Sequence, residues 1–189
     1  MASFRSLFGI AYLTSAVICS QTVFDSSTHP QYKNRVYEFE VELPPHLKYE
    51  RTMPPNPDHG IGIDLSDSTK LWVDASYTDS STAEEDMKTL TAGGQVTENK
   101  PALLGGKPAI LAAFSCAADA YDKAYQERLV LSVRRKPNRS RTCFQIGIRT
   151  YIGSITAQEN ELFEKLIQGF RYTDNNGRGQ SRASPILSE

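Results

Sequence analysis

Two helix-start signals interrupt a chain that otherwise alternates apolar and polar residues with the period of β-strands. Ser81-Thr-Ala-Glu84 and Thr156-Ala-Gln-Glu159 each place a hydroxyl three residues before a glutamate, which is the spacing of a capping box. Segments with strand character lie before the first box and between the two boxes. The order strands, helix, strands, helix predicts an α+β domain, with an antiparallel β-sheet and two flanking helices.

The expected strands are short apolar or alternating runs that end at turn residues. They span 36–43, 61–65, 71–77, 108–117, 125–133 and 142–151. The first helix ends at Gly93-Gly94, and the second carries one apolar stripe. That stripe consists of Leu162, Phe163, Leu166, Ile167 and Phe170. The Pro-rich segment 50–60 and the Gly-rich segment 93–107 are predicted loops, and loops on a rigid sheet are candidate binding segments.

The N-terminus has the pattern of an export signal. Arg5 precedes an apolar run over residues 7–18, and Cys19-Ser-Gln follows with small or polar side chains. The run is short for a membrane-spanning helix. Ile18 stands where a lipoprotein signal has a small residue, so membrane contact is expected only if Cys19 is lipidated. We therefore predict a periplasmic or secreted protein.

The predicted organisation is a single folded unit between polar ends. A signal peptide covers 1–20, a flexible arm 21–34, one α+β domain 35–173 and a mobile polar tail 174–189. A domain of this length buries a core without a disulfide or a metal ion. The formal net charge of −1 lacks the basic excess of nucleic-acid-binding proteins, so no nucleic-acid partner is expected.

Two cysteines lie within the predicted domain, Cys116 and Cys143. In an antiparallel meander they fall at opposite ends of a strand of about nine residues, roughly 30 Å apart. A disulfide needs Cα atoms within about 7 Å. We predict two unpaired thiols. Cys116 shares a strand face with Ile110, Ala112 and Phe114, which indicates a core position rather than a nucleophile.

No residue pattern points to catalysis or to a cofactor. His29, His46 and His59 form no His-x-x-x-His or His-Glu pair, Cys-x-x-Cys is absent, and so is Gly-x-Ser-x-Gly. We predict a protein without enzymatic activity, metal ion or cofactor.

The acidic residues around one predicted hairpin allow two other interpretations. Asp64 and Asp67 are a fragment of a calcium-binding loop, although a solvated turn is the favoured explanation. Asp58, His59, Asp64 and Asp74 are the candidates for an unrecognised catalytic site. Asp58 and His59 also lie in the Pro-rich loop, which makes them candidates for partner binding.

Two further features are candidates for binding another protein. The predicted turn 134–141 is either a solvated hairpin tip or a docking point for an acidic partner or membrane headgroups. Its cations are Arg134, Arg135, Lys136, Arg139 and Arg141. Trp72 shares a strand face with Asp74 and Ser76. It is a core residue if a helix covers that face, and an interface anchor if none does.

Three local patterns resemble the PsbP-like fold family. They are Tyr37-Glu-Phe-Glu-Val-Glu-Leu-Pro44, Leu104-Gly-Gly-Lys-Pro-Ala109 and Leu162-Phe-Glu-Lys-Leu-Ile-Gln-Gly-Phe-Arg171. The family includes extrinsic subunits of the photosynthetic oxygen-evolving complex, a nuclear Ran-release factor, bacterial DcrB-type envelope proteins and immunity proteins against secreted toxins. Most members bind partners without catalysis, so the resemblance implies a binding module over residues 35–173.

Three functional hypotheses follow from these observations. The first is an exported, non-catalytic protein-binding module, of which an envelope immunity protein that blocks a toxin is the most specific form. The second is a structural or stress-related accessory subunit of an envelope complex, which uses the basic turn 134–141. The third is an enzyme with the acidic site named above.

Overall fold

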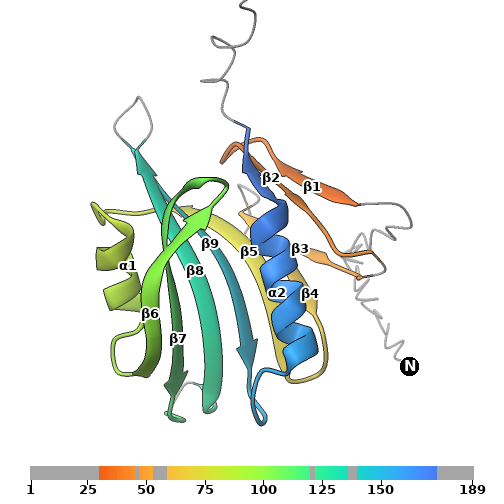
Figure 1. The fold of residues 1–189 in the computed structure, drawn as a ribbon, viewed down its shortest axis with the longest axis vertical. Helices are drawn as coiled ribbons and strands as arrows, with labels where there is room; N and C mark the ends of the chain where they lie inside the picture. Colours follow the sequence, from red (N-terminus) through yellow and green to blue (C-terminus); the bar gives the residue numbers. More distant parts are fainter. Residues whose placement is uncertain (1–29, 46, 53–58, 120–121, 136–139, 174–189) are drawn as a thin grey trace, which may run out of the picture.

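The computed structural model describes residues 30–45, 47–52, 59–119, 122–135 and 140–173 (Figure 1). Within these residues, two antiparallel sheets pack with two helices in an α+β arrangement, as predicted. The larger sheet has seven strands in the order β3-β4-β5-β9-β8-β7-β6, and the smaller has the order β1-β2-β10. The signal peptide, residues 21–29 of the arm and the tail lie outside the described residues.

The strands of the larger sheet include all five expected segments between 61 and 151. Their bounds are β3 Glu50–Thr52, β4 Gly60–Asp64, β5 Thr69–Tyr77, β6 Gln95–Leu104, β7 Lys107–Cys116, β8 Tyr125–Arg135 and β9 Arg141–Thr150. β6 to β9 form a meander that returns to β5, so segments far apart in the chain become neighbours. Trp72 on β5 lies opposite Gly147 on β9, which in turn lies opposite Leu129 on β8.

The N-terminal strand prediction is wrong in its bounds. A hairpin of β1 (Gln31–Asn34) and β2 (Phe39–Glu42) replaces one strand over 36–43, and β1 belongs to the segment predicted as an arm. The Asn34 side chain accepts hydrogen bonds from the backbone N–H groups of Val36 and Tyr37, at 3.0 and 2.9 Å. Glu38 takes the left-handed conformation with φ of 60°. A side-chain acceptor and a left-handed residue together make a turn that alternation alone does not reveal.

Three more strands lie where none was expected. β6 occupies most of the segment predicted as a Gly-rich loop, β3 lies in the predicted Pro-rich loop, and β10 (Phe170–Tyr172) follows the last helix. β3 and β6 are the two edges of the larger sheet. An edge strand tolerates polar residues on both faces and a proline such as Pro101, which is why their sequences resemble loops.

Both helices begin close to the predicted capping boxes. The box of α2 (Ala157–Gly169) is confirmed, because Thr156 Oγ1 accepts from the Glu159 N–H at 3.2 Å and the Glu159 carboxylate accepts from the Thr156 N–H at 2.8 Å. In α1 (Ala83–Leu90) the N-cap is Thr82, one residue later than predicted. No helix among the described residues has the length and apolar character needed to cross a membrane.

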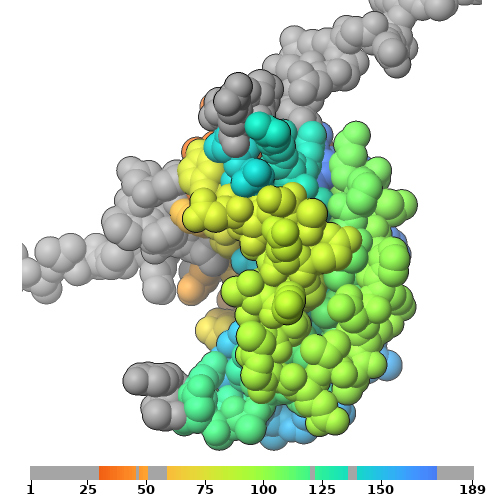
Figure 2. Space-filling model, turned by 90° about the vertical axis from the view of Figure 1, so that its left-hand side faces the viewer, coloured from red at the N-terminus to blue at the C-terminus, as the bar shows by residue number. Residues whose placement is uncertain are grey.

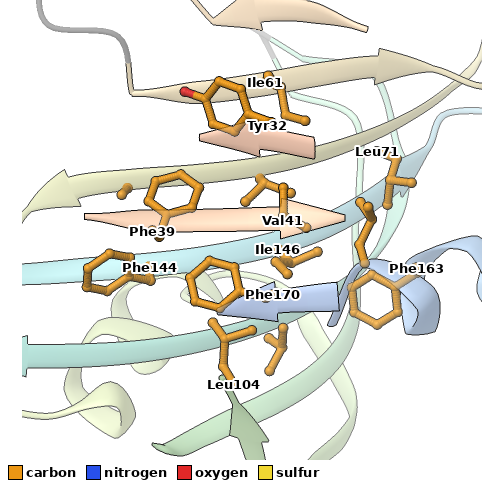
Figure 3. Packing of buried hydrophobic residues seen from close by; sticks show 14 of the residues in the cluster. Tyr32, Phe39, Val41, Ile61, Leu71, Leu104, Phe144, Ile146, Phe163 and Phe170 are labelled. Atoms are coloured by element: carbon orange, nitrogen blue, oxygen red, sulfur yellow. The ribbon is translucent and has the colours of Figure 1, made fainter. Parts of the chain in front are cut away.

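The two faces of the larger sheet are covered unequally. α2 and the smaller sheet cover one face and enclose the main core (Figure 3). Its aromatic centre consists of Phe39, Phe144, Phe163 and Phe170, each fully or almost fully buried. On the other face α1 packs mainly over β7 and β8, where Met87 is part of a second, smaller apolar cluster.

The two thiols are unpaired, as the predicted strand order requires. Cys116 ends β7 in register with Tyr125, whereas Cys143 lies near the start of β9 in register with Val133. Cys143 is buried, and burial is the largest cause that raises the pKa of its thiol.

Candidate partner-binding face

Among the described residues, no element covers the half of the larger sheet formed by β3, β4 and β5 on the side that carries α1. Figure 2 shows α1 facing the viewer, with the molecular surface receding beside it toward the strands of the β3–β4 region. Because side chains alternate along a strand, this face receives Trp72 and Asp74 from β5 and Gly147 and Arg149 from β9. We call this surface the Trp72 face.

Trp72 lies at the centre of the surface and is half-buried. Its indole lies directly over Gly147, where an added Cβ would stand 2.1 Å from the indole Cζ2 atom. A hollow of about 330 Å³ lies beside it, lined by Glu50, Gly62, Ile63, Asp64, Lys70, Leu71 and Trp72. The residue contacts the edge of the cluster under α1 and remains half-exposed, so its environment lies between the two alternatives considered from the sequence.

Arg149 is a cation close to Trp72 on this surface. Its guanidinium carbon lies 5.9 Å from the centre of the Trp72 ring and 4.0 Å from that of Tyr125. Arg149 also donates hydrogen bonds to the Glu127 carboxylate at 2.6 Å and to the Tyr151 hydroxyl at 3.3 Å. Its second ion pair, with Asp122, has an N–O distance of 3.3 Å. A fixed cation therefore lies among aromatic rings and carboxylates.

Burial and charge have opposite effects on the pKa values of the paired side chains Glu127 and Arg149. Burial raises the pKa of Glu127, although the neighbouring Arg149 charge lowers it. For Arg149, burial works against the charged form, but the hydrogen bond to Tyr151 and the Glu127 charge raise its pKa. The sequence analysis did not single out Arg149 or Glu127. The position of Arg149, on the same face as Trp72 but on another strand, became visible only with the register of β5 and β9.

Carboxylates predominate over cations around Trp72. A second hollow, of about 550 Å³, is lined by Asp67, Ser68, Asp119, Asp122, Lys123, Tyr151 and Ile152. Together the two hollows and their strand neighbours carry seven carboxylates and three cations. The carboxylates are Glu50, Asp64, Asp67, Asp74, Asp119, Asp122 and Glu127, and the cations are Lys70, Lys123 and Arg149.

The basic turn between β8 and β9 lies away from Trp72. Arg134 stacks over the Tyr172 ring at 4.2 Å, Arg141 donates to the Asp79 carbonyl at 3.1 Å, and Arg135 is exposed. Six residues of β9 separate Arg141 from Gly147, which corresponds to roughly 20 Å. The candidate binding residues thus fall into two groups of opposite charge at different ends of the strands. Lys136 and Arg139 lie outside the described residues.

The structure does not bring the proposed catalytic residues together. Asp64 pairs with Lys70 at 3.3 Å, and Asp74 accepts a hydrogen bond from Gln145 at 3.2 Å. Asp64 and Asp74 lie four residues apart along the β4–β5 ladder, about 13 Å. Asp58 lies outside the described residues.

The His59 side chain contacts an aromatic ring, and its backbone carbonyl accepts a hydrogen bond from the N–H of Ala75, next to Asp74. Its Nε2 atom lies 3.5 Å from the Tyr37 hydroxyl, and its ring packs against the Tyr37 ring with centroids 5.3 Å apart. Within the part of the chain that the structure describes, no three His, Cys, Asp or Glu side chains are placed to share a metal ion.

The fold is PsbP-like, as the three local patterns predicted. No protein-family model and no curated protein sequence matches the chain. PsbP from the cyanobacterium Synechocystis (CyanoP) superposes with a TM-score of 0.52 at 13% identity, over 76% of this chain and 91% of CyanoP. LpqN of Mycobacterium tuberculosis, described as involved in cell envelope biogenesis, superposes with a TM-score of 0.54 at 15% identity, over 71% of this chain and 83% of LpqN. A Saccharomyces cerevisiae Ran-binding protein, Mog1p, superposes with a TM-score of 0.47 at 14% identity, over 79% of this chain and 97% of Mog1p. At identities this low, the superpositions on CyanoP and LpqN show a shared fold and nothing beyond it.

Proposed function

We propose that this chain is an exported, non-catalytic module that binds another protein through the Trp72 face. The observation that carries the proposal is the uncovered half of the larger sheet, with a half-buried tryptophan at its centre. Large aromatic residues ringed by polar groups are typical anchors of protein interfaces. The separation of Asp64 from Asp74, about 13 Å along the strands, supports binding over catalysis.

Export is supported by the basic and apolar pattern of the first twenty residues. Export also agrees with the role of LpqN, which is described as involved in cell envelope biogenesis. The more specific forms of the proposal are an immunity protein that blocks a toxin and an accessory subunit of an envelope complex.

A comparative capture experiment tests the binding function. The full-length chain with a C-terminal tag is expressed in its own source and recovered, and the bound proteins are identified by mass spectrometry. We expect one stoichiometric partner, at least about tenfold depleted with Trp72→Ala because an interface anchor has been removed.

A matched control is Leu103→Ala, which removes an exposed apolar side chain (64% exposed) from the edge strand β6. Equal recovery with wild type and Trp72→Ala, or loss only with Leu103→Ala, would reject the Trp72 face as the binding site. The immunity form further requires that the chain inhibit the toxic activity of its captured partner. If the chain does not change the activity of its captured partner, the accessory role is the form of the proposal that remains.

A further inference from the structure

We propose that the Trp72 face binds a basic segment of its partner protein, whose Arg or Lys side chains enter the two hollows beside Arg149. This inference rests on the proposed function and specifies the chemistry of the partner. It follows from the charge of the surface, from its aromatic side chains and from the arrangement of the hollows.

Charge complementarity is the first argument. The seven carboxylates around Trp72 exceed the three cations by four, whereas the whole chain has a formal net charge of only −1. The negative charge is therefore concentrated around the two hollows. Like charges that meet across an interface cost several kcal/mol, so this surface disfavours acidic proteins, nucleic acid and anionic lipid headgroups.

The aromatic side chains provide the second argument. Trp72 and Tyr151 line separate hollows, and each hollow also contains carboxylates. A guanidinium or ammonium group gains from contact with an aromatic face and from a neighbouring carboxylate, and Trp is the best aromatic partner. Arg149 already binds in this way within the chain, against Tyr125, Glu127 and Asp122.

The position of Arg149 explains why the added cations must come from outside. Arg149 lies between the two hollows, with Trp72 on one side and Asp122 and Tyr151 on the other. Its charge is offset by Glu127 and Asp122. The carboxylates farther from it, Glu50 and Asp67, remain in excess around the hollows.

Exposed apolar surface continues beyond the second hollow. Ile152 is 75% exposed and lines the same hollow as Asp122 and Tyr151. The aliphatic stem of an Arg or Lys side chain packs on such a surface while its charged end reaches a carboxylate. The surface thus fits a segment with several basic side chains better than a single free cation.

Trp72 is the only tryptophan of the chain, so its fluorescence reports on this face alone. The probe is a synthetic peptide of alternating Gly and Arg, about eight residues and roughly 26 Å when extended. The comparison peptide alternates Gly and Glu. We expect a saturable change of Trp72 emission in the full-length chain with the Arg peptide, weaker at high salt because the attraction is screened, and none with the Glu peptide.

The decisive variant is Glu50→Lys/Asp64→Lys, which reverses two exposed charges beside Trp72. We expect at least about tenfold weaker binding of the Arg peptide. The matched control Glu42→Lys/Glu161→Lys changes the total charge equally but on β2 and α2, across the larger sheet, and should bind like wild type. If the variant Glu50→Lys/Asp64→Lys unfolds at a lower urea concentration than wild type, the neutral variant Glu50→Gln/Asp64→Asn is tested in its place.

Several outcomes overturn the inference. The inference fails if Trp72 emission shows no saturable response to the Arg peptide, or if it responds equally to the Glu peptide. It also fails if the control variant loses as much binding of the Arg peptide as Glu50→Lys/Asp64→Lys does. The same variants in the capture experiment separate the two proposals. A partner lost with Trp72→Ala but retained with Glu50→Lys/Asp64→Lys would uphold the binding function and reject the basic partner. A partner retained with Trp72→Ala would reject the Trp72 face as the binding site.

Discussion

At the scale of single residues, Gly147 determines where the Trp72 indole lies. A side chain at position 147 would occupy the space of the indole, since the added Cβ would stand only 2.1 Å from it. The absence of that Cβ allows the ring to lie against β9 and close to Arg149. A backbone position with no chemistry of its own thus shapes the candidate binding surface.

Gly147→Ala should displace the indole from β9. We expect a red-shifted Trp72 emission, because the ring moves into water, and a loss of about 1–3 kcal/mol in the free energy of unfolding. Fluorescence and urea denaturation measure the two effects. In the double variant Trp72→Ala/Gly147→Ala the second substitution should cost less, since the clash is gone. Unchanged emission in Gly147→Ala would contradict this packing.

At the scale of elements, the start of α2 depends on a reciprocal pair of hydrogen bonds. Glu159 accepts from the backbone N–H of Thr156, and this bond is the largest cause of its lowered pKa. A negative charge in the first turn also interacts favourably with the positive end of the helix. α2 contacts β9 and β2, so its stability is coupled to both sheets.

The Glu159 carboxylate should stabilise the fold only while it is ionised. Its pKa in the folded chain lies below the reference value of 4.5, so the stabilisation is complete above about pH 4.5 and is lost as the pH falls through the lower folded value. Glu159→Gln should be less stable than wild type by about 0.3–1 kcal/mol at neutral pH and low salt. The urea midpoints of wild type and Glu159→Gln should converge as the pH falls below the pKa of Glu159 in the folded chain, and a constant gap would contradict a role for the charge.

At the scale of the whole molecule, the aromatic core joins the two sheets. Phe39 of β2 stacks on Phe170 of β10 with ring centroids 5.3 Å apart, and it meets Phe144 of the larger sheet edge-on at 6.0 Å. All three rings are buried, as Figure 3 shows. The covered face therefore maintains the fold, whereas the opposite face is covered in part, by α1.

Phe39→Ala should weaken the contact between the two sheets. Loss of a fully buried phenylalanine costs about 3–5 kcal/mol, through the lost transfer free energy and the cavity left behind. Urea denaturation measures the total, and hydrogen exchange should show the largest loss of protection in β1 and β2. Leu103→Ala, at an exposed position, should change stability by less than about 0.5 kcal/mol. Equal effects of the two substitutions would contradict the packing.

The sequence by itself determined the class of the fold and its central strands. Alternating residues over 61–65, 71–77, 125–133 and 142–151 predicted strands that the structure contains, because a half-buried sheet requires a period of two. The Thr156 box predicted the start of α2, because capping is a local interaction. The unpaired thiols followed from strand order alone.

Only the tertiary structure determined the edges of the sheets and the composition of the Trp72 face. The β6 sequence resembles a loop because an edge strand is half-solvated and tolerates Pro101. Arg149 meets Trp72 because β9 pairs with β5, and a contact between residues so distant in the chain depends on register, which no local pattern specifies. The same pairing places Trp72 and the basic turn at different positions along the strands, so the two candidate binding features lie apart.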